Sequence, residues 1–241
     1  MATILTLQHS AVGRPGRLGL TLRDHGFKLD VRRLDLQGSL EEVTLEGCQG
    51  LLVLGGPQSP TEASPWLRHE MDLIKRAHDA ELPVIGVCLG CQLIGAALGG
   101  TVGKLPTPEA GFVDVDVVGA GQTDTITAGI PWRTGWFNSH EYGVTELPPG
   151  ATRLMSSDAC ENHGFRVGLR TFAFQSHIEA DRAIIDGLFS TEHELFKRSG
   201  VDGAELARSA EAEYARFAEV ADRLCVNLAS YAFPFSALIG A

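Results

Sequence analysis

The sequence predicts an α/β fold in which a doubly wound, mostly parallel sheet carries appended hairpin strands and C-terminal helices. Short apolar runs alternate with longer amphipathic runs over the first hundred residues, which is typical of strand–helix–strand units with right-handed crossovers. From residue 101 to about 177 the pattern changes to short strand-like segments, and the tail from residue 183 has helical spacing. The 241 residues, 44% of them hydrophobic, can bury one sizeable core. We therefore expect a single domain over residues 1–241, with a helical extension at about 190–241.

The elements before residue 100 are predicted from hydrophobic periodicity and from glycine and proline positions. In chain order they are a strand ATILTLQ, a helix RLGLTLRDHG ending at Gly26, strands KLDVRRLDL and GLLVLGG, a helix SPWLRHEMDLIKRAHDAEL, a strand PVIGVC and a helix LGCQLIGAALGG. Pro65 suits the first turn of the middle helix, and Gly99 and Gly100 end the last one.

The later elements differ in kind. Five short strand candidates separated by turns predict hairpins that extend the sheet: FVDVDVV, GWFNSHEYGV, TRLMSS, GFRVG and TFAFQSH. A long amphipathic helix then starts near Ala204, and one face of it is apolar at Leu206, Tyr214, Phe217 and Val220. This face either packs onto the sheet, which we favour, or serves as a docking or dimerisation surface.

Charge and cysteine content limit the function classes. The 30 acidic and 20 basic residues give a net charge of −10, which disfavours nucleic acid and anionic membrane partners. The first residues are apolar without a basic region, so they predict a strand rather than a signal peptide. Five cysteines, an odd number, favour a reduced and cytoplasmic setting.

The segment VIGVCLGCQ carries the first indication of chemistry. A buried strand leads directly into a helix, and Gly86 and Gly90 stand two residues on either side of Cys88. Glycines at these positions permit the sharp strand-to-helix turn that exposes a nucleophile at the carboxyl end of a strand. The helix N-terminus beyond it favours thiolate over thiol. We therefore expect Cys88 to be a nucleophile.

This segment has two other interpretations. Cys88 can be a small apolar residue in a core strand, the usual place of a free cysteine. Cys88 and Cys91 also form a C-x-x-C, which suggests a redox pair or half of a zinc site. No second Cys or His pair has ligand spacing, so the sequence predicts no metal and no cofactor, and Cys91 is expected to pack the helix.

A catalytic cysteine requires a base and an oxyanion hole. His177 ends an apolar strand, and Glu179 follows where it can orient the ring. His140, at another strand end, is a second candidate for the base. A buried strand also ends in Gly55 and Gly56, a pair that lets backbone N–H groups approach a ligand.

Together these residues resemble the class I, triad-type glutamine amidotransferases, of the kind found as the glutaminase of GMP synthetase. The matching motifs, in the family's order, are G-G-P-x-S at 55–59, G-V-C-L-G-x-Q at 86–92, S-H at 139–140 and F-Q-x-H-x-E at 174–179. The resemblance implies a flavodoxin-like fold and hydrolysis of a γ-glutamyl amide through a cysteinyl thioester. It implies that Cys88 is the nucleophile, His177 the base and then the acid, and Glu179 the third triad member. It further implies the remaining site residues, namely oxyanion donors at Gly56 and Leu89 and a glutamine pocket lined by Gln92, Ser139 and His140.

Departures from the family pattern leave the substrate open. Ile178 stands where proline is usual, and Glu141 and Tyr142 stand where glycine and aspartate are common. The 241 residues contain no recognisable synthetase domain, so we expect any ammonia-accepting synthetase to be a separate chain. Three alternatives follow: a glutaminase that supplies ammonia to a separate synthetase or acts alone, a hydrolase of γ-glutamyl peptides or conjugates, and a non-enzymatic binding or regulatory relative.

Overall fold

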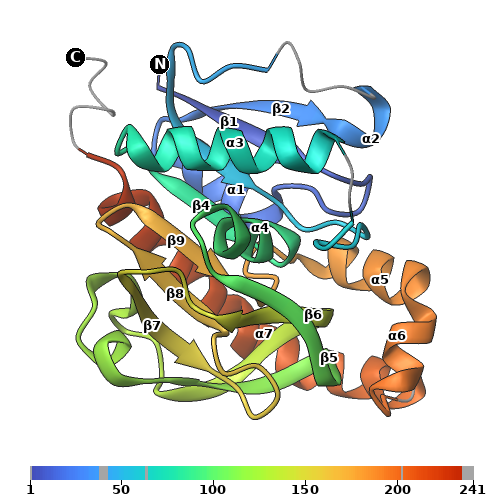
Figure 1. Ribbon diagram of the computed structural model, residues 1–241. Helices are drawn as coiled ribbons and strands as arrows, with labels where there is room; N and C mark the ends of the chain where they lie inside the picture. The colour runs from blue at the N-terminus through green and yellow to red at the C-terminus, as the bar shows by residue number, and fades with distance from the viewer. Residues whose placement is uncertain (1, 38–42, 63–64, 202, 235–241) are drawn as a thin grey trace.

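The computed structural model contains one nine-stranded sheet with helices on both faces (Figure 1). The structure describes residues 2–37, 43–62, 65–201 and 203–234, with residues 65 and 203–211 as backbone only. The strands are β1 (Thr3–Gln8), β2 (Lys28–Arg33), β3 (Cys48–Val53), β4 (Val84–Val87), β5 (Thr101–Val117), β6 (Arg133–Glu146), β7 (Ala151–Ser156), β8 (Gly164–Val167) and β9 (Thr171–Phe174).

The sheet order is β2-β1-β3-β4-β9-β8-β7-β5-β6. The first five strands in this order are parallel, with β4 between β3 and β9 through pairs such as Leu51 with Val84 and Val84 with Thr171. The remaining strands are antiparallel to their neighbours and form the hairpin extension. The predicted fold class is thus confirmed. The carboxyl ends of β3, β4 and β9 lie side by side, which is where ligands bind in sheets of this type.

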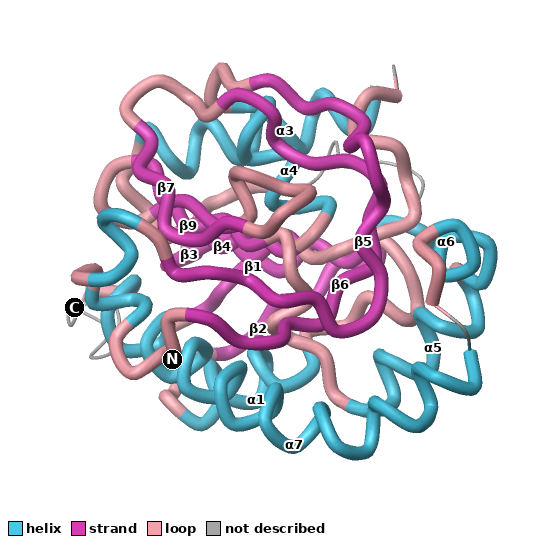
Figure 2. The backbone as a smooth tube through the Cα atoms, turned by 90° about the horizontal axis from the view of Figure 1, so that it is seen from below, coloured by secondary structure: helices cyan, strands magenta, loops and turns pink. Residues whose placement is uncertain are grey.

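Helices cover the sheet in two layers, which are separated clearly in Figure 2. The main helices are α1 (Gly16–Asp24), α2 (Leu34–Gln37), α3 (Pro65–Asp79), α4 (Leu89–Ala97), α5 (Arg182–Thr191), α6 (His193–Arg198) and α7 (Gly203–Asn227), followed by a π-helical turn η3 (Leu228–Ala232). Helices α1 and α7 lie on one face and α3 and α4 on the other. One apolar core fills each of these two interfaces.

Several predicted strands have different bounds in the structure. The segment TFAFQSH, for example, is a strand only to Phe174, so His177 lies in the loop after β9 and does not end the strand. The segment KLDVRRLDL is a strand only to Arg33, and Leu34 starts the short helix α2. Strand β5 begins at Thr101, much earlier than the FVDVDVV segment that predicted it. Its pairing with β6 shifts between Lys104 and Glu109, and this irregularity accommodates two prolines that would otherwise interrupt the ladder.

The described part of α7 packs onto the body of the protein. Phe217 and Val220 are buried, and Tyr214 packs against the same core. The Tyr214 hydroxyl accepts a hydrogen bond from Nη2 of Arg17 in α1 at 2.9 Å. The packing alternative is therefore confirmed for these three residues, while the Leu206 side chain lies outside the described residues. Among the described residues, the helices are too short or too polar to cross a membrane.

Candidate active site

Cys88 occupies a sharp turn between β4 and α4. Its backbone has φ 52° and ψ −107°, a conformation that non-glycine residues rarely adopt. A Cβ at Gly86 would lie 2.5 Å from the Gly90 carbonyl oxygen, and a Cβ at Gly90 would lie 2.1 Å from the Val53 carbonyl oxygen. Both glycines are therefore required by close backbone contacts. The turn is held by the Cys88 N–H, which donates to the Phe174 carbonyl at 2.9 Å.

His177 and Glu179 follow β9 and are paired with each other. The ring atom Nδ1 of His177 lies 2.8 Å from Oε1 of Glu179, and both side chains are buried. The backbone on either side is fixed, because the His177 N–H donates to the Phe137 carbonyl and the Arg17 N–H donates to the Glu179 carbonyl, each at 2.9 Å. With Nδ1–H directed at the carboxylate, Nε2 of the ring is left for another partner.

Cys88 and His177 lie against the same backbone position, Gly55 in the loop after β3. A Cβ at Gly55 would be 2.9 Å from Cε1 of His177 and 3.4 Å from Cβ of Cys88. Burial alone lowers the pKa of His177, but the Glu179 carboxylate and the Cys88 sulfur outweigh burial and raise this pKa well above its ordinary value. The arrangement therefore favours an imidazolium beside the cysteine.

Leu89 and Gly56, the two residues expected to supply oxyanion donors, directly follow Cys88 and Gly55 in the chain. Leu89 is the first residue of α4, where the N–H has no acceptor within the helix. Gly56 follows Gly55, and its N–H finds no backbone acceptor within the described chain. A Cβ at Gly56 would lie 2.4 Å from Cβ of His9 and 2.4 Å from Oε1 of Gln58, so only glycine fits there.

A pocket of about 440 Å³ opens in front of Cys88. Its size lies within the usual range for small-molecule sites. Its lining comes from the loop after β3, the start of α4, strand β6 and the α5–α6 connection: Gly56, Pro57, Gln58, Ser59, Pro60, Cys88, Gln92, Ser139, His140, Glu141, Tyr142, Thr191, Glu192, His193, Glu194, Leu195 and Arg198.

Gln92 and Ser139 both line this pocket, and both are tied to the protein. Nε2 of Gln92 donates to the Tyr142 carbonyl at 2.8 Å and to Oε1 of Gln175 at 3.2 Å. Oγ of Ser139 donates to a carboxylate oxygen of Glu192. Both amide hydrogens of Gln92 are therefore directed at protein acceptors, which fixes α4 to the β6 wall.

His140, the second candidate for the base, lines the pocket but faces a different carboxylate. Its Nε2 lies 3.0 Å from Oε2 of Glu109, and its Nδ1 lies 3.0 Å from the Tyr142 carbonyl oxygen. Burial lowers the pKa of His140, although Glu109 acts in the opposite direction. His177 therefore pairs with Glu179 close to Cys88, whereas His140 pairs with Glu109.

Cys91 lies in α4, and its side chain packs in the apolar core, as expected. Its side chain is fully buried, and burial raises the pKa of its thiol well above the ordinary value. All five cysteines are free, so Cys88 and Cys91 do not form a disulfide.

Several pocket residues could not be predicted as site residues from the sequence. Glu192 and Arg198 come from the α5–α6 segment, which the sequence predicts only as part of a helical extension. Arg198 pairs with Glu141 at 2.9 Å, and Lys104 pairs with the same carboxylate at 3.3 Å. Burial raises the pKa of Glu192 above its ordinary value. No local motif marks these residues, since their place depends on how α6 folds over β6.

Comparisons with known proteins agree with these motifs. A family model described as glutamine amidotransferase class-I matches residues 18–185. The glutamine amidotransferase-like protein YfeJ of Salmonella typhimurium is 34% identical over 166 residues, which cover 66% of this chain and 67% of that protein. A glutamine-hydrolysing GMP synthase subunit from Natronomonas pharaonis is 29% identical over 174 residues, covering 68% of this chain and 84% of that protein.

Solved structures give the same result over nearly the whole chain. The crystal structure of a glutamine amidotransferase from Methylobacillus flagellatus has a TM-score of 0.85 at 25% identity, covering 97% of this chain and 96% of that one. A glutamine amidotransferase from Thermotoga maritima has a TM-score of 0.81 at 25% identity, with coverage of 95% and 98%.

Proposed function

The chain belongs to the class I glutamine amidotransferase family, and from this premise we propose that it hydrolyses the γ-amide of glutamine through a thioester on Cys88. The observation that carries the proposal is the common contact of Cys88 and His177 with Gly55, together with the His177–Glu179 pair. These features support the assignment of Cys88 as nucleophile, His177 as base and Glu179 as orienting carboxylate.

The proposed reaction has two halves. The Cys88 thiolate attacks the amide carbon, and the resulting oxyanion is stabilised by the N–H groups of Gly56 and Leu89. The carbon–nitrogen bond then breaks, and His177 gives its proton to the leaving nitrogen, which departs as ammonia. Water next attacks the thioester while His177 takes a proton from it, and the carbon–sulfur bond breaks to release glutamate and restore Cys88. Glu179 holds the ring throughout and stabilises its charged form.

The pocket wall supplies the proposed substrate contacts. Ser139 and His140 border the nucleophile through β6, where the Ser139 carbonyl oxygen lies 3.8 Å from Sγ of Cys88. The free amine of a glutamine would suit the carboxylates on the α5–α6 side, and its carboxylate would suit a cationic or N–H donor such as Arg198. Gln92 acts by holding the Tyr142 end of this wall.

Labelling with a glutamine-like diazo-ketone tests the nucleophile. The purified chain should be modified at Cys88, and Cys88→Ala should lose both labelling and ammonia release from glutamine. Cys91→Ala is the matched control and should still be labelled. Modification at Cys91 in the wild-type protein would contradict the proposal.

A substrate panel tests the chemistry of the leaving group. Ammonia release from glutamine is compared with amino acid release from γ-glutamyl dipeptides at equal concentrations. A higher kcat/KM for glutamine supports the proposal. A preference for the dipeptides would assign the same thioester chemistry to γ-glutamyl conjugates instead.

A further inference from the structure

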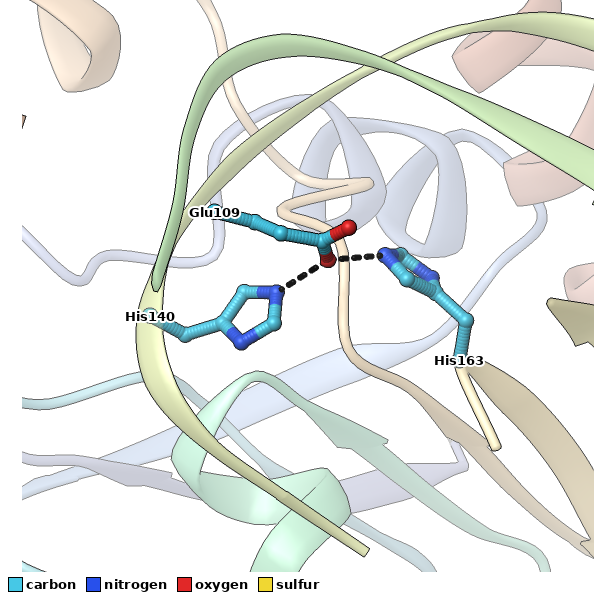
Figure 3. Close-up of side chains that lie close together, drawn as sticks. All are labelled: Glu109, His140 and His163. Atoms are coloured by element: carbon cyan, nitrogen blue, oxygen red, sulfur yellow. Dashed lines mark ion pairs between the residues drawn. The ribbon is translucent and has the colours of Figure 1, made fainter. Parts of the chain in front are cut away.

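Three side chains of metal-ligating types lie close together, as Figure 3 shows, and one of them, His140, also lines the pocket. Glu109 comes from β5, His140 from β6, and His163 from the residue before β8. All three side chains are buried. They are far apart in the sequence and converge only because β5, β6 and β8 belong to one antiparallel extension of the sheet.

The separations within this cluster suit a shared cation. Oε2 of Glu109 lies 3.0 Å from Nε2 of His140 and 3.5 Å from Nε2 of His163, and the ligand atoms all lie within 4.8 Å of one another. Two ligands bonded to Zn²⁺ at about 2.1 Å with a tetrahedral angle are about 3.4 Å apart. The three side chains can therefore reach one ion with small adjustments.

The orientation of His140 places a ring nitrogen lone pair opposite a carboxylate oxygen. Its Nδ1 faces the Tyr142 carbonyl oxygen, an acceptor, so the proton of the neutral ring lies on Nδ1. Nε2 then turns its lone pair toward the Glu109 carboxylate. Nε2 of His140 and Oε2 of Glu109 are both buried and have no hydrogen-bond partner among the described residues. A cation between the two atoms removes this repulsion and satisfies both.

The surrounding residues hold the ligands as metal sites require. Oε1 of Glu109 accepts a hydrogen bond from Oγ of Ser157 at 2.7 Å, which leaves Oε2 for the ion. The Tyr142 carbonyl fixes the His140 ring in the manner usual for ligating histidines. Oδ1 of Asn138 accepts a hydrogen bond from Nε2 of His163 at 3.1 Å, and its Nδ2 donates to the Trp136 carbonyl. Binding of the ion at Nε2 of His163 therefore releases that proton and leaves Oδ1 of Asn138 as a further oxygen ligand.

We propose that Glu109, His140 and His163 bind a divalent transition metal ion, with Zn²⁺ as the fitting probe. Two imidazoles and one carboxylate favour zinc over magnesium or calcium, which prefer all-oxygen sites. His140 belongs to both the cluster and the pocket wall. A bound ion would therefore link β5 and the residue before β8 to the part of β6 that lines the pocket with Cys88. Metal binding at this cluster can be tested without an activity assay, so its outcome is separate from that of the proposed function.

Metal content and thermal stability test the proposal directly. The full chain is stripped with a chelator, dialysed and titrated with Zn²⁺. About one Zn²⁺ per chain should be retained, and the Tm should rise by several degrees on zinc addition, since a ligand that binds only the folded state stabilises it. Mg²⁺ should give no rise. Bound Co²⁺ should give the visible absorption of a low-coordinate nitrogen and oxygen site.

Two variants locate the ion. Glu109→Gln and His163→Gln should lose stoichiometric zinc and the zinc-dependent rise in Tm. His25→Gln, a half-exposed histidine at the end of α1, is the matched control and should keep both. Should the variants fail to fold, the wild-type metal content decides by itself. Wild-type protein that retains no zinc, or a folded His163→Gln that retains it fully, would overturn the proposal.

Discussion

Nδ1 of His177 lies 2.8 Å from Oε1 of Glu179, two residues further along the same buried loop. The pair predicts unequal losses on mutation. His177→Ala should abolish glutamine turnover, because the proton carrier itself is removed. Glu179→Gln should retain more activity, with a loss about a hundredfold smaller, because the ring keeps its place but loses its charged partner. Steady-state kcat values for the two variants check this order, and equal losses would contradict it.

His140→Ala is the control for the identity of the base. His140 faces Glu109 and the Tyr142 carbonyl, so its loss should alter KM more than kcat. An inactive His140→Ala beside an active His177→Ala would assign the base to His140 instead.

The close contact of Gly90 with β3 predicts a large steric effect at one position. Gly90→Ala would bring a Cβ within 2.1 Å of the Val53 carbonyl oxygen, and the overlap should cost about 1 to 3 kcal/mol or more in the free energy of unfolding. Activity should fall too, because the turn at Cys88 must shift. Gly135→Ala in β6 is the matched control, since its nearest described neighbour is 3.9 Å away. Chemical denaturation of both variants measures the difference.

The fold class and the strand-to-helix turn at Cys88 were predictable because each rests on local sequence patterns. The glycines around Cys88 and the apolar β4 and β9 strands report directly on a buried strand and its turn. The contact of Glu109 with His140 was not predictable, and neither was the position of Glu192 beside Ser139. Both contacts join elements that are distant in the sequence. Strand β5 was underestimated for a related reason: its prolines lower strand propensity locally, while pairing with β6 maintains the ladder.

A buried pair beneath the Gly56 loop predicts a pH-dependent stability. Nε2 of His9 lies 2.9 Å from Oε1 of Glu70, and both side chains are fully buried. Burial lowers the pKa of His9, but the Glu70 carboxylate outweighs burial and raises this pKa above its ordinary value of 6.5. The protonated ring is thus favoured in the folded state, so its stabilisation is complete below pH 6.5 and declines as the pH rises through the folded pKa.

The double variant His9→Leu with Glu70→Met removes both members of the pair and serves as the reference. The free energy of unfolding of the wild type, minus that of the double variant, should fall as the pH rises above about 6.5. Urea denaturation at several pH values measures this difference. A difference that grows with pH would contradict the assignment of the proton to His9.

The ion pair between Arg198 and Glu141 predicts an effect on binding with little effect on stability. Both side chains line the pocket, and Arg198 is half exposed, so the pair contributes at most about 1 kcal/mol to folding. Arg198→Gln should leave the Tm nearly unchanged but raise the KM for glutamine about threefold to tenfold. Lys75→Gln, which breaks an exposed pair with Asp79 on α3, is the control and should change neither.

The structure of the loop that carries Gly56 predicts that the chain is active without a synthetase partner. In a glutaminase that depends on a synthetase, a poorly formed oxyanion hole keeps glutamine hydrolysis slow while the synthetase is absent. Glutamine is then not hydrolysed without a substrate to accept the ammonia. Here the loop is pinned on both sides. The Leu54 N–H donates to the Leu7 carbonyl at 3.0 Å, and Nε2 of Gln58 donates to the His9 carbonyl at 3.3 Å.

Since the same loop also packs against the His9 side chain, its N–H groups should need no partner to reach their working positions. We therefore expect the isolated chain to hydrolyse glutamine or another γ-glutamyl amide at a rate that added synthetase changes little. The measurement is the single-turnover rate of Cys88 acylation. It is made on the isolated chain and again after addition of a candidate ammonia-accepting synthetase from the cells in which the protein occurs. An increase of about a hundredfold or more, the worth of one oxyanion donor, would show instead that a partner completes the site.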